Sequence, residues 1–343
     1  MLSATFSPMQ RHFDFASRTA RVTAGWVVRE EAIMGTAIRV ELWAEDRRMG
    51  EAAAGAVMDE MHRIDRAMSP HKAGSELSRI NRDAARSPVA VTEEMFRLLQ
   101  RAQAFSQLSG GAFDITYAAV GQLYDYRNRV RPSAEALAQA RTCVGWQGLQ
   151  LNPADRTVRF AKDGMRIDLG GFAKGHAVDQ AAELLTRRGV RHAWVSAGGD
   201  SRVLGDRRGR PWTVAIRDPR RPGEVVAVLP LEDTSISTSG DYERFFDDGA
   251  ERVHHLIDPA TGESPHGVHS VTILSADGLS CEALSKAVFV LGTQRGLALI
   301  ETLPGTDAVV VDAQGQLHAS SGLLNGVTQD LPPNAQPGPG PAQ

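Results

Sequence analysis

A change of pattern near residue 150 constrains the fold of this chain more than any other feature of its sequence. Before it, Val57, Met61, Ile64 and Met68 follow one another at helical spacing, which predicts an amphipathic helix. After it, short apolar runs alternate with glycine-rich turns. Strands are predicted there over 192–200, 212–218, 225–231, 269–275 and 307–313. Helices and strands interleave without regular βαβ alternation, which predicts a mixed α+β fold.

The first half also contains a strand and a second helix. Residues 36–44 alternate apolar and polar side chains, as a half-buried strand does. Residues 92–111 predict a helix with Thr92 as its N-cap, Phe105 and Leu108 on its apolar face and Gly110 as its stop.

We expect one folded domain over 26–328, with a helical part to about residue 150 and a strand-rich part after it. Residues 1–25 are predicted to be weakly ordered, and the Pro/Gly-rich residues 329–343 to be disordered.

Composition excludes several classes of protein. The 343 residues are 42% hydrophobic, enough for a large core, and a net charge of −3 carries no nucleic-acid signature. No apolar run approaches the roughly 18 residues of a membrane span, so no membrane insertion is expected. Two cysteines make neither a disulfide framework nor a four-ligand zinc site. The N-terminus lacks the apolar core of a signal peptide and an early lipid-anchor cysteine, so a cytoplasmic location is expected.

The densest local signal is residues 168–175, DLGGFAKG. A strand ending at Asp168, the glycines 170 and 171, and a helix start would place backbone N–H groups and Lys174 around a phosphate. The segment matches neither standard nucleotide-binding motif. A tight strand–helix turn with a solvated lysine remains the alternative. Lysine is scarce in this chain, with only four examples, Lys72, Lys162, Lys174 and Lys286, among 38 basic residues.

Three other stretches contain candidate site residues. Asp114 follows Phe113 after a predicted helix end and is either a turn residue or a site residue. Residues 237–246 form either a helix N-cap or a hydroxyl-lined loop. His254 and His255 would face opposite sides of a strand, so only one can enter a given site. A histidine there is either structural or a base that a nearby Asp258 orients.

The order of these stretches is more specific than any one of them. From about Met34 to Gly292 the chain resembles the ApbE-type flavin transferase family. The resemblance rests on MGT (34–36), SELSRIN (75–81), GGAFDIT (110–116), DLGGFAKGHAVD (168–179), STSGDY (237–242), HHLIDPATG (254–262), SVTIL (270–274) and EALSKAVFVLG (282–292).

This resemblance implies an α+β fold related to the tunnelling-fold barrels, with FAD as substrate and a divalent cation, usually Mg²⁺, on its pyrophosphate. FMN would pass through its phosphate to a Thr or Ser of a separate acceptor protein, with release of AMP. The family is often exported, in contrast to the cytoplasmic location expected from the N-terminus.

The resemblance also assigns roles to particular residues. His255 would promote transfer, with Asp258 beside it, and the carbonyl of Gly171 would face the metal. The other positions that it implies for FAD binding are Met34, His71, Ala112, Phe113, Asp114, Asp168 and Lys174.

Two positions depart from the family pattern. His71 replaces an aromatic residue, commonly Tyr, that stacks on FAD. Glu282 and Lys286 replace an Asp and a Thr that ligate the metal. As an isolated i,i+4 pair they would form an ordinary surface ion pair. At the metal positions, Glu282 can supply an oxygen but a protonated Lys286 cannot. We therefore expect a weakened metal site in which Lys286, oriented by Glu282, contacts the pyrophosphate partly in the metal's place.

Three hypotheses for function remain open at this point. They are an FAD:protein FMN transferase, a hydrolase that splits the FAD pyrophosphate with water, and an FAD-binding protein or degenerate paralogue with an impaired metal site. Lys286 favours the third, whereas His255 and residues 168–175 favour the two enzymes.

Overall fold

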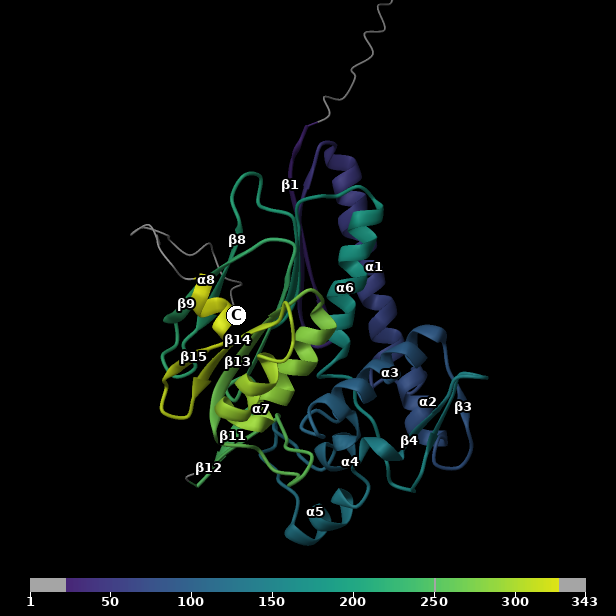
Figure 1. Cartoon of the computed structure of the whole chain (residues 1–343). Coiled ribbons are helices and arrows are strands. Elements are labelled where there is room, and N and C mark those ends of the chain that lie inside the picture. Colours follow the sequence, from purple (N-terminus) through teal and green to yellow (C-terminus); the bar gives the residue numbers. More distant parts are fainter. Residues whose placement is uncertain (1–22, 250, 327–343) are drawn as a thin grey trace, which may run out of the picture.

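A computed structural model describes residues 23–249 and 251–326 (Figure 1). Most of the segment 1–25 and the whole tail 329–343, for which weak order was predicted, lie outside the described residues. Within them, helices and strands are interleaved, and the predicted α+β class is confirmed.

The strands are β1 (Gly25–Ile33), β2 (Thr36–Ala44), β3 (Val89–Ala90), β4 (Leu149–Asn152), β5 (Thr157–Phe160), β6 (Ala193–Ala197), β7 (Asp200–Leu204), β8 (Trp212–Arg217), β9 (Val225–Leu231), β10 (Ser235–Gly240), β11 (Phe245–Asp248), β12 (Glu251–His254), β13 (Val268–Ser275), β14 (Asp307–Asp312) and β15 (Leu317–Ala319). The helices are α1 (Arg47–Met68), α2 (Glu76–Asp83), α3 (Glu93–Leu108), η1 (Ile115–Tyr117), α4 (Ala118–Gly121), α5 (Ala134–Arg141), η2 (Trp146–Gly148), α6 (Ala173–Arg187), α7 (Gly278–Ile300) and α8 (Ser321–Gly326), where η marks a 3-10 helix.

One large antiparallel sheet organises the molecule. Its strand order is β1-β2-β6-β7-β10-β13-β14-β15. The predicted strand 36–44 is β2, which pairs with β6 in the register Ile38 to Ala197. Strands from both sides of residue 150, β1 and β2 before it and the other six after it, therefore belong to one sheet.

Helices α1, α6 and α7 cover one face of this sheet (Figure 1). The predicted stripe of α1 is buried, with Val57, Met61 and Ile64 fully inside the core. Helices α6 and α7 approach closely because both have glycine at the contact. A Cβ on Gly175 would lie 2.3 Å from the carbonyl oxygen of Gly278. This contact brings the N-terminal turns of the two helices together.

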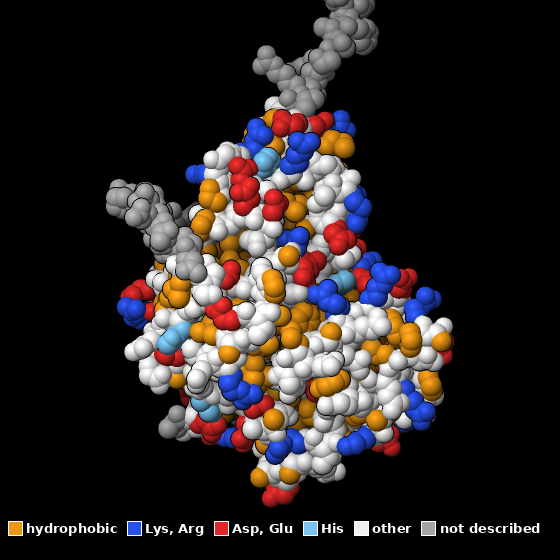
Figure 2. Space-filling view, in the orientation of Figure 1, with side chains coloured by type: hydrophobic (Ala, Val, Ile, Leu, Met, Phe, Trp, Pro, Cys, Tyr) orange, Lys and Arg blue, Asp and Glu red, His pale blue; other side chains and the backbone are white. Residues whose placement is uncertain are grey.

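The opposite face is covered by the β8–β9 hairpin (Figure 1). Trp26 packs edge-on against Trp212 and Trp43, and Trp194 packs edge-on against Trp212, at centroid separations of 5.4 to 5.7 Å. Acidic and basic side chains are interspersed over the surface that Figure 2 shows.

Helix α3 starts as predicted and differs at its end. The Thr92 hydroxyl accepts a hydrogen bond from the Met95 N–H at 3.3 Å, and Gly110 adopts a φ of 63° just after the helix. Phe105 is buried, but Leu108 is 41% exposed. The prediction that Leu108 lies on the apolar face is therefore wrong, because Leu108 lies in the last turn of the helix, where the chain leaves the core.

The predicted strand that ends at Asp168 is absent, and residues 166–169 run without regular structure. Their backbone groups are satisfied elsewhere. The Asn81 amide donates to Ile167 O at 2.9 Å and accepts from Ile167 N at 2.8 Å, and Asp168 N donates to Ile115 O at 3.0 Å. A side chain from α2 thus takes the place of a neighbouring strand.

Helix α7 is long and apolar enough to cross a membrane by length and composition alone, with 23 residues and a mean hydropathy of 1.2. It instead packs on β10, β13 and α6, and Ala283, Ala287 and Val288 are buried. The apolar composition of α7 is therefore explained by its burial in the core.

A carboxylate on α3 connects three helices. Glu94 accepts hydrogen bonds from Arg63 of α1 at 2.7 Å and pairs with His176 of α6 at 2.8 Å. The hydrogen bonds from His176 and Arg63 lower the pKa of Glu94 to about 2. A carboxyl whose folded-state pKa is lowered stabilises the fold above its ordinary value and loses that contribution as pH falls.

We predict that Glu94→Gln lowers the free energy of unfolding by about 1–3 kcal/mol at neutral pH. The difference from the unchanged protein should shrink as pH falls from about 4.5 towards about 2. Urea unfolding at several pH values measures both effects. Glu93→Gln is the matched control, because Glu93 pairs only with exposed Arg97 on the same helix. Equal losses for the two variants would contradict the role of Glu94.

Candidate active site

Two lysines and two carboxylates come together where α6 and α7 meet β7. We call this group the lysine–carboxylate cluster: Lys174, Asp200, Glu282 and Lys286. The carboxylates of Asp200 and Glu282 are 3% and 0% exposed, and the side chains of Lys174 and Lys286 are 24% and 18% exposed. The surface ion pair considered for Glu282 and Lys286 is therefore wrong, because the pair is largely buried.

Glu282 has both carboxylate oxygens engaged. Oε1 lies 2.5 Å from Lys174 Nζ, and Oε2 accepts a hydrogen bond from Gly175 N at 2.7 Å. The Gly175 N–H belongs to the first turn of α6, where the helix dipole favours negative charge. The carboxylate of Glu282 thus occupies the N-terminal end of α6, where the sequence predicted a bound phosphate.

Lys174 is held by two carboxylates. Its ammonium donates to Asp200 and to Glu282. Burial by itself lowers the pKa of Lys174, but the charges of Asp200 and Glu282 outweigh burial and raise that pKa well above its ordinary value. Burial likewise raises the pKa of Asp200, and the charges of Lys174 and Lys286 more than reverse this effect. The reading of Lys174 as a solvated lysine is wrong.

Hydroxyls of β10 complete the cluster. Ser237 donates to Asp200 at 2.6 Å, and Ser239 lies 2.8 Å from the Ser285 hydroxyl. Residues 235–240 form a buried strand, so neither a helix N-cap nor an open hydroxyl loop describes this stretch. The serines instead supply polar partners inside the core.

Lys286 is the less tightly held lysine. Its Nζ lies 3.5 Å from Glu282 Oε1 and 3.5 Å from Ser285 Oγ, and its Cε lies 3.3 Å from the Cβ position of Gly171. Burial lowers the pKa of Lys286, the charges of Glu282 and Asp200 offset this only in part, and the charge of Lys174 adds to the lowering. Glu282 thus orients Lys174 more closely than it orients Lys286.

The residues present do not fit a divalent cation. Gly171, Glu282 and Lys286, to which the resemblance assigns the metal, do lie together. Magnesium needs oxygen ligands, but both oxygens of Glu282 are engaged and the side chain of Lys286 adjoins Gly171. In the described part of the chain, no group of three or more His, Cys, Asp or Glu side chains is arranged to hold a metal.

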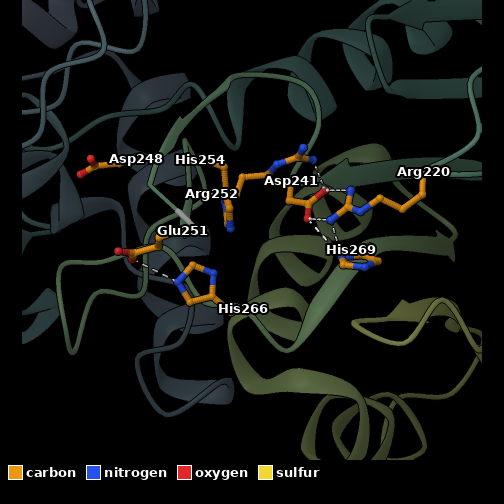
Figure 3. Close-up of a pocket in the computed structure, with 8 residues that line it drawn as sticks. All are labelled: Arg220, Asp241, Asp248, Glu251, Arg252, His254, His266 and His269. Atoms are coloured by element: carbon orange, nitrogen blue, oxygen red, sulfur yellow. Dashed lines mark hydrogen bonds and ion pairs between the residues drawn. The ribbon is translucent and has the colours of Figure 1, made fainter.

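The paired histidines face different surroundings. His254 ends β12, is 1% exposed, and bonds through Nε2 to Pro265 O at 3.0 Å. It lines a pocket of about 520 Å³ (Figure 3). The other residues of this pocket are Arg220, Asp241, Asp248, Glu251, Arg252, His266 and His269.

His255 lies just past β12, and its backbone N–H donates to Arg244 O at 3.0 Å. Burial, then the nearby charge of Lys286, then His254 and Arg244 lower the pKa of His255 to about 3. The ring is therefore neutral at physiological pH. Its buried Nδ1 has no hydrogen-bond partner among residues 23–249 and 251–326. His255 thus combines a free ring nitrogen with proximity to the ammonium of Lys286.

Asp258 does not orient His255 through any hydrogen bond in the described structure. Its carboxylate accepts from Ala260 N at 2.8 Å, and its backbone closes the turn to Gly262 and Glu263. The proline that follows Asp258 and this local capping explain the residue without a catalytic role.

Phe113 and Asp114 are also structural here. Asp114 is 6% exposed, caps η1 through Thr116, and accepts from Trp146 N at 2.8 Å. Burial, partly offset by these hydrogen bonds, raises its pKa. Phe113 is 5% exposed and packs against Phe172. These contacts give both side chains a structural role, and their predicted place at the nucleotide stays a prediction, as does that of half-buried Ala112.

The remaining predicted contacts lie at two turns and a loop. Met34 and Gly35 form the β1–β2 turn, with φ values of 55° and 71°, and His71 is exposed between α1 and α2. Asp168 accepts from Gly170 N at 2.7 Å and from the Tyr117 hydroxyl at 3.3 Å. These residues stay predictions for FAD binding.

Sequence reasoning missed three residues around this site. Asp200 carries half of the negative charge of the cluster, and its only sequence signal was its place after Gly198–Gly199. Tyr117 bonds Asp168. Arg244 reaches within 3.9 Å of the Cβ position of Gly35, and its charge acts on Tyr117 and His255. Arg244 therefore adds a guanidinium between the Met34 turn and His255.

An antiparallel α+β fold with lysines, an arginine and a neutral histidine around one point defines a candidate anion-handling enzyme site. A family model described as the ApbE family matches residues 34–310. The chain therefore belongs to the ApbE family.

Relatives agree in both sequence and structure. The FAD:protein FMN transferase of Treponema pallidum is 34% identical over 319 residues, which cover 87% of this chain and 88% of that protein. The protein of the same name from Klebsiella pneumoniae is 28% identical and covers 84% of this chain and 90% of that protein. The crystal structure of the ApbE protein of Thermotoga maritima superposes with a TM-score of 0.82 at 31% identity, covering 88% of this chain and 99% of that one. The flavin transferase ApbE from Vibrio cholerae gives 0.79 at 27% identity, with 88% and 99% covered.

We predict that Lys174→Met lowers the free energy of unfolding by about 3–5 kcal/mol, because it leaves two buried carboxylates without their counter-ion. Chemical denaturation at neutral pH measures the loss. Lys162→Met is the matched control, since the Lys162 ammonium donates only to the Thr142 carbonyl. A Lys174→Met protein as stable as the control would show that the cluster contributes little to folding.

Proposed function

We propose that this protein transfers FMN from FAD to a Thr or Ser of an acceptor protein and releases AMP. Membership of the ApbE family supports this function, as do the names of the relatives. The observation that carries the proposal at the level of the site is the neutral ring of His255, whose Nδ1 has no hydrogen-bond partner among the described residues and whose pKa the charge of Lys286 helps to lower.

The proposed reaction is a phosphoryl transfer in which one P–O bond forms and one breaks. The acceptor hydroxyl oxygen attacks the phosphorus of the FMN half, the P–O bond to the bridging oxygen breaks, and AMP leaves with that oxygen. The proton of the hydroxyl passes to the ring of His255, which is neutral at physiological pH. Lys286 and Arg244 are the cations placed to face the phosphates.

A divalent cation would stabilise charge on the pyrophosphate when bound. The proposed mechanism takes no step through it, because Glu282 already binds Lys174 and Gly175 with both oxygens. The family expectation of Mg²⁺ becomes a weak site at most in this chain.

A flavin-binding protein without transferase activity is the second candidate, and Lys286 is the residue that favours it. Purified protein incubated with FAD, with and without an acceptor peptide containing Thr, separates the candidates. Transfer gives AMP together with peptide-bound flavin. AMP and free FMN without labelled peptide would indicate hydrolysis by water, and no AMP in either case would indicate binding alone.

We predict that His255→Ala cuts transfer by about 100-fold or more while FAD binding stays within a few-fold of the unchanged protein. The expected loss follows from removal of the proposed proton acceptor. Initial rates of peptide labelling and calorimetry with FAD measure the two effects. His254→Ala is the control, and the assignment of His255 is wrong if that variant loses more turnover.

We also predict that FAD binds mainly through its phosphates and AMP part. Riboflavin lacks both and is expected to bind at least about tenfold more weakly, since charge-assisted hydrogen bonds contribute about 1.5–3 kcal/mol. Calorimetry with FAD, FMN and riboflavin tests this. Riboflavin that binds as tightly as FAD would contradict a phosphate-centred site.

A further inference from the structure

We propose that Lys286 is a built-in cation for the FAD pyrophosphate, and that Lys174 keeps the two carboxylates from competing for it. The inference rests on the proposed function, whose ligand it uses, and adds that binding of FAD needs no divalent metal. It is carried by the different ways in which the two lysines are held.

The first step concerns Lys174. Its ammonium contacts a carboxylate on each side, from Asp200 of β7 and from Glu282 of α7. Glu282 uses its second oxygen on Gly175 N, and Asp200 uses its second oxygen on Ser237. The carboxylates are therefore satisfied without Lys286.

The second step concerns Lys286. Its two polar contacts, to Glu282 and Ser285, are both at 3.5 Å, the outer limit of a hydrogen bond. An ammonium has three donors. Lys286 is thus a largely buried lysine with donors to spare, beside the glycine turn at Gly171.

The third step is the balance of charge. Two ammonium groups and two carboxylates give the cluster no net formal charge. A divalent cation added between Glu282 and Gly171 would lie close to the side chain of Lys286, and the charge of an ammonium there repels a cation. A pyrophosphate brings negative charge and acceptor oxygens instead, and an ammonium binds it as a point charge. The cluster therefore suits the anion without the metal.

Calorimetry of FAD and riboflavin in EDTA and in millimolar Mg²⁺ tests the inference. For the unchanged protein, the dissociation constant of FAD should differ by less than about threefold between the two conditions. Lys286→Met should weaken FAD binding in EDTA about 10- to 100-fold and leave riboflavin binding unchanged. Lys162→Met is the control for removal of a lysine and should change neither. Unchanged riboflavin binding also shows that the variant is folded.

Lys286→Thr adds a second arm, because it puts a hydroxyl oxygen in place of the ammonium. FAD binding by this variant should become tighter in Mg²⁺ than in EDTA. The inference is overturned if the unchanged protein loses more than about tenfold of its FAD affinity in EDTA, if Lys286→Met binds FAD normally, or if Lys286→Thr shows no gain from Mg²⁺.

The same samples separate this inference from the proposed function. Metal-independent FAD binding that depends on Lys286, without labelled peptide, would refute transfer and support the built-in cation. Transfer together with FAD binding that appears only with Mg²⁺ would support the function and refute the inference. Absence of FAD binding under both conditions would refute both.

Discussion

The carboxylate of Glu282 at the first turn of α6 is the contact on which the site depends. It has a counterpart, because Asp179 of α6 accepts hydrogen bonds from Gly278 N at 2.8 Å and Leu279 N at 3.0 Å at the start of α7. Each helix thus caps the other, and each N-terminal dipole receives a negative charge. Gly175 and Gly278 allow this arrangement, because a side chain on either would collide with the other helix.

This reciprocal capping determines where a ligand phosphate can bind. The N–H of Gly175, which an anion would otherwise use, is taken by Glu282. A phosphate must therefore rely on side-chain cations, and the charges of Lys286 and Arg244 both act on His255. The site consequently depends on long side chains from α7 and from the turn after β10, and less on the glycine turn itself.

Local patterns in the sequence were enough to predict local structure. The stripe of α1, the strand 36–44 and the Thr92 cap follow from spacing and side-chain chemistry, and the structure confirms them. Residues 166–169 resembled a strand because their apolar pattern is that of one, but the partner of their backbone is Asn81, 86 positions from Ile167. No local rule identifies such a partner.

The partners of the site residues are also distant in the sequence, so local patterns could not identify them. Asp114 has one sequence context whether it caps a turn or binds a nucleotide, and its cap of η1 through Thr116 N and its contact with distant Trp146 N are known only from the structure. Lys174 and Glu282 are 108 positions apart, so the sequence suggested nearby Lys286 as the partner of Glu282 and gave no sign that Lys174 is the closer one. The distances in the structure show which lysine Glu282 holds. Burial disfavours the charge of both ammonium groups, and the charges of Asp200 and Glu282 reverse this for Lys174 but only partly offset it for Lys286, which the charge of Lys174 also disfavours. A bound phosphate would give Lys286 the close anionic partner that Glu282, at 3.5 Å, does not provide.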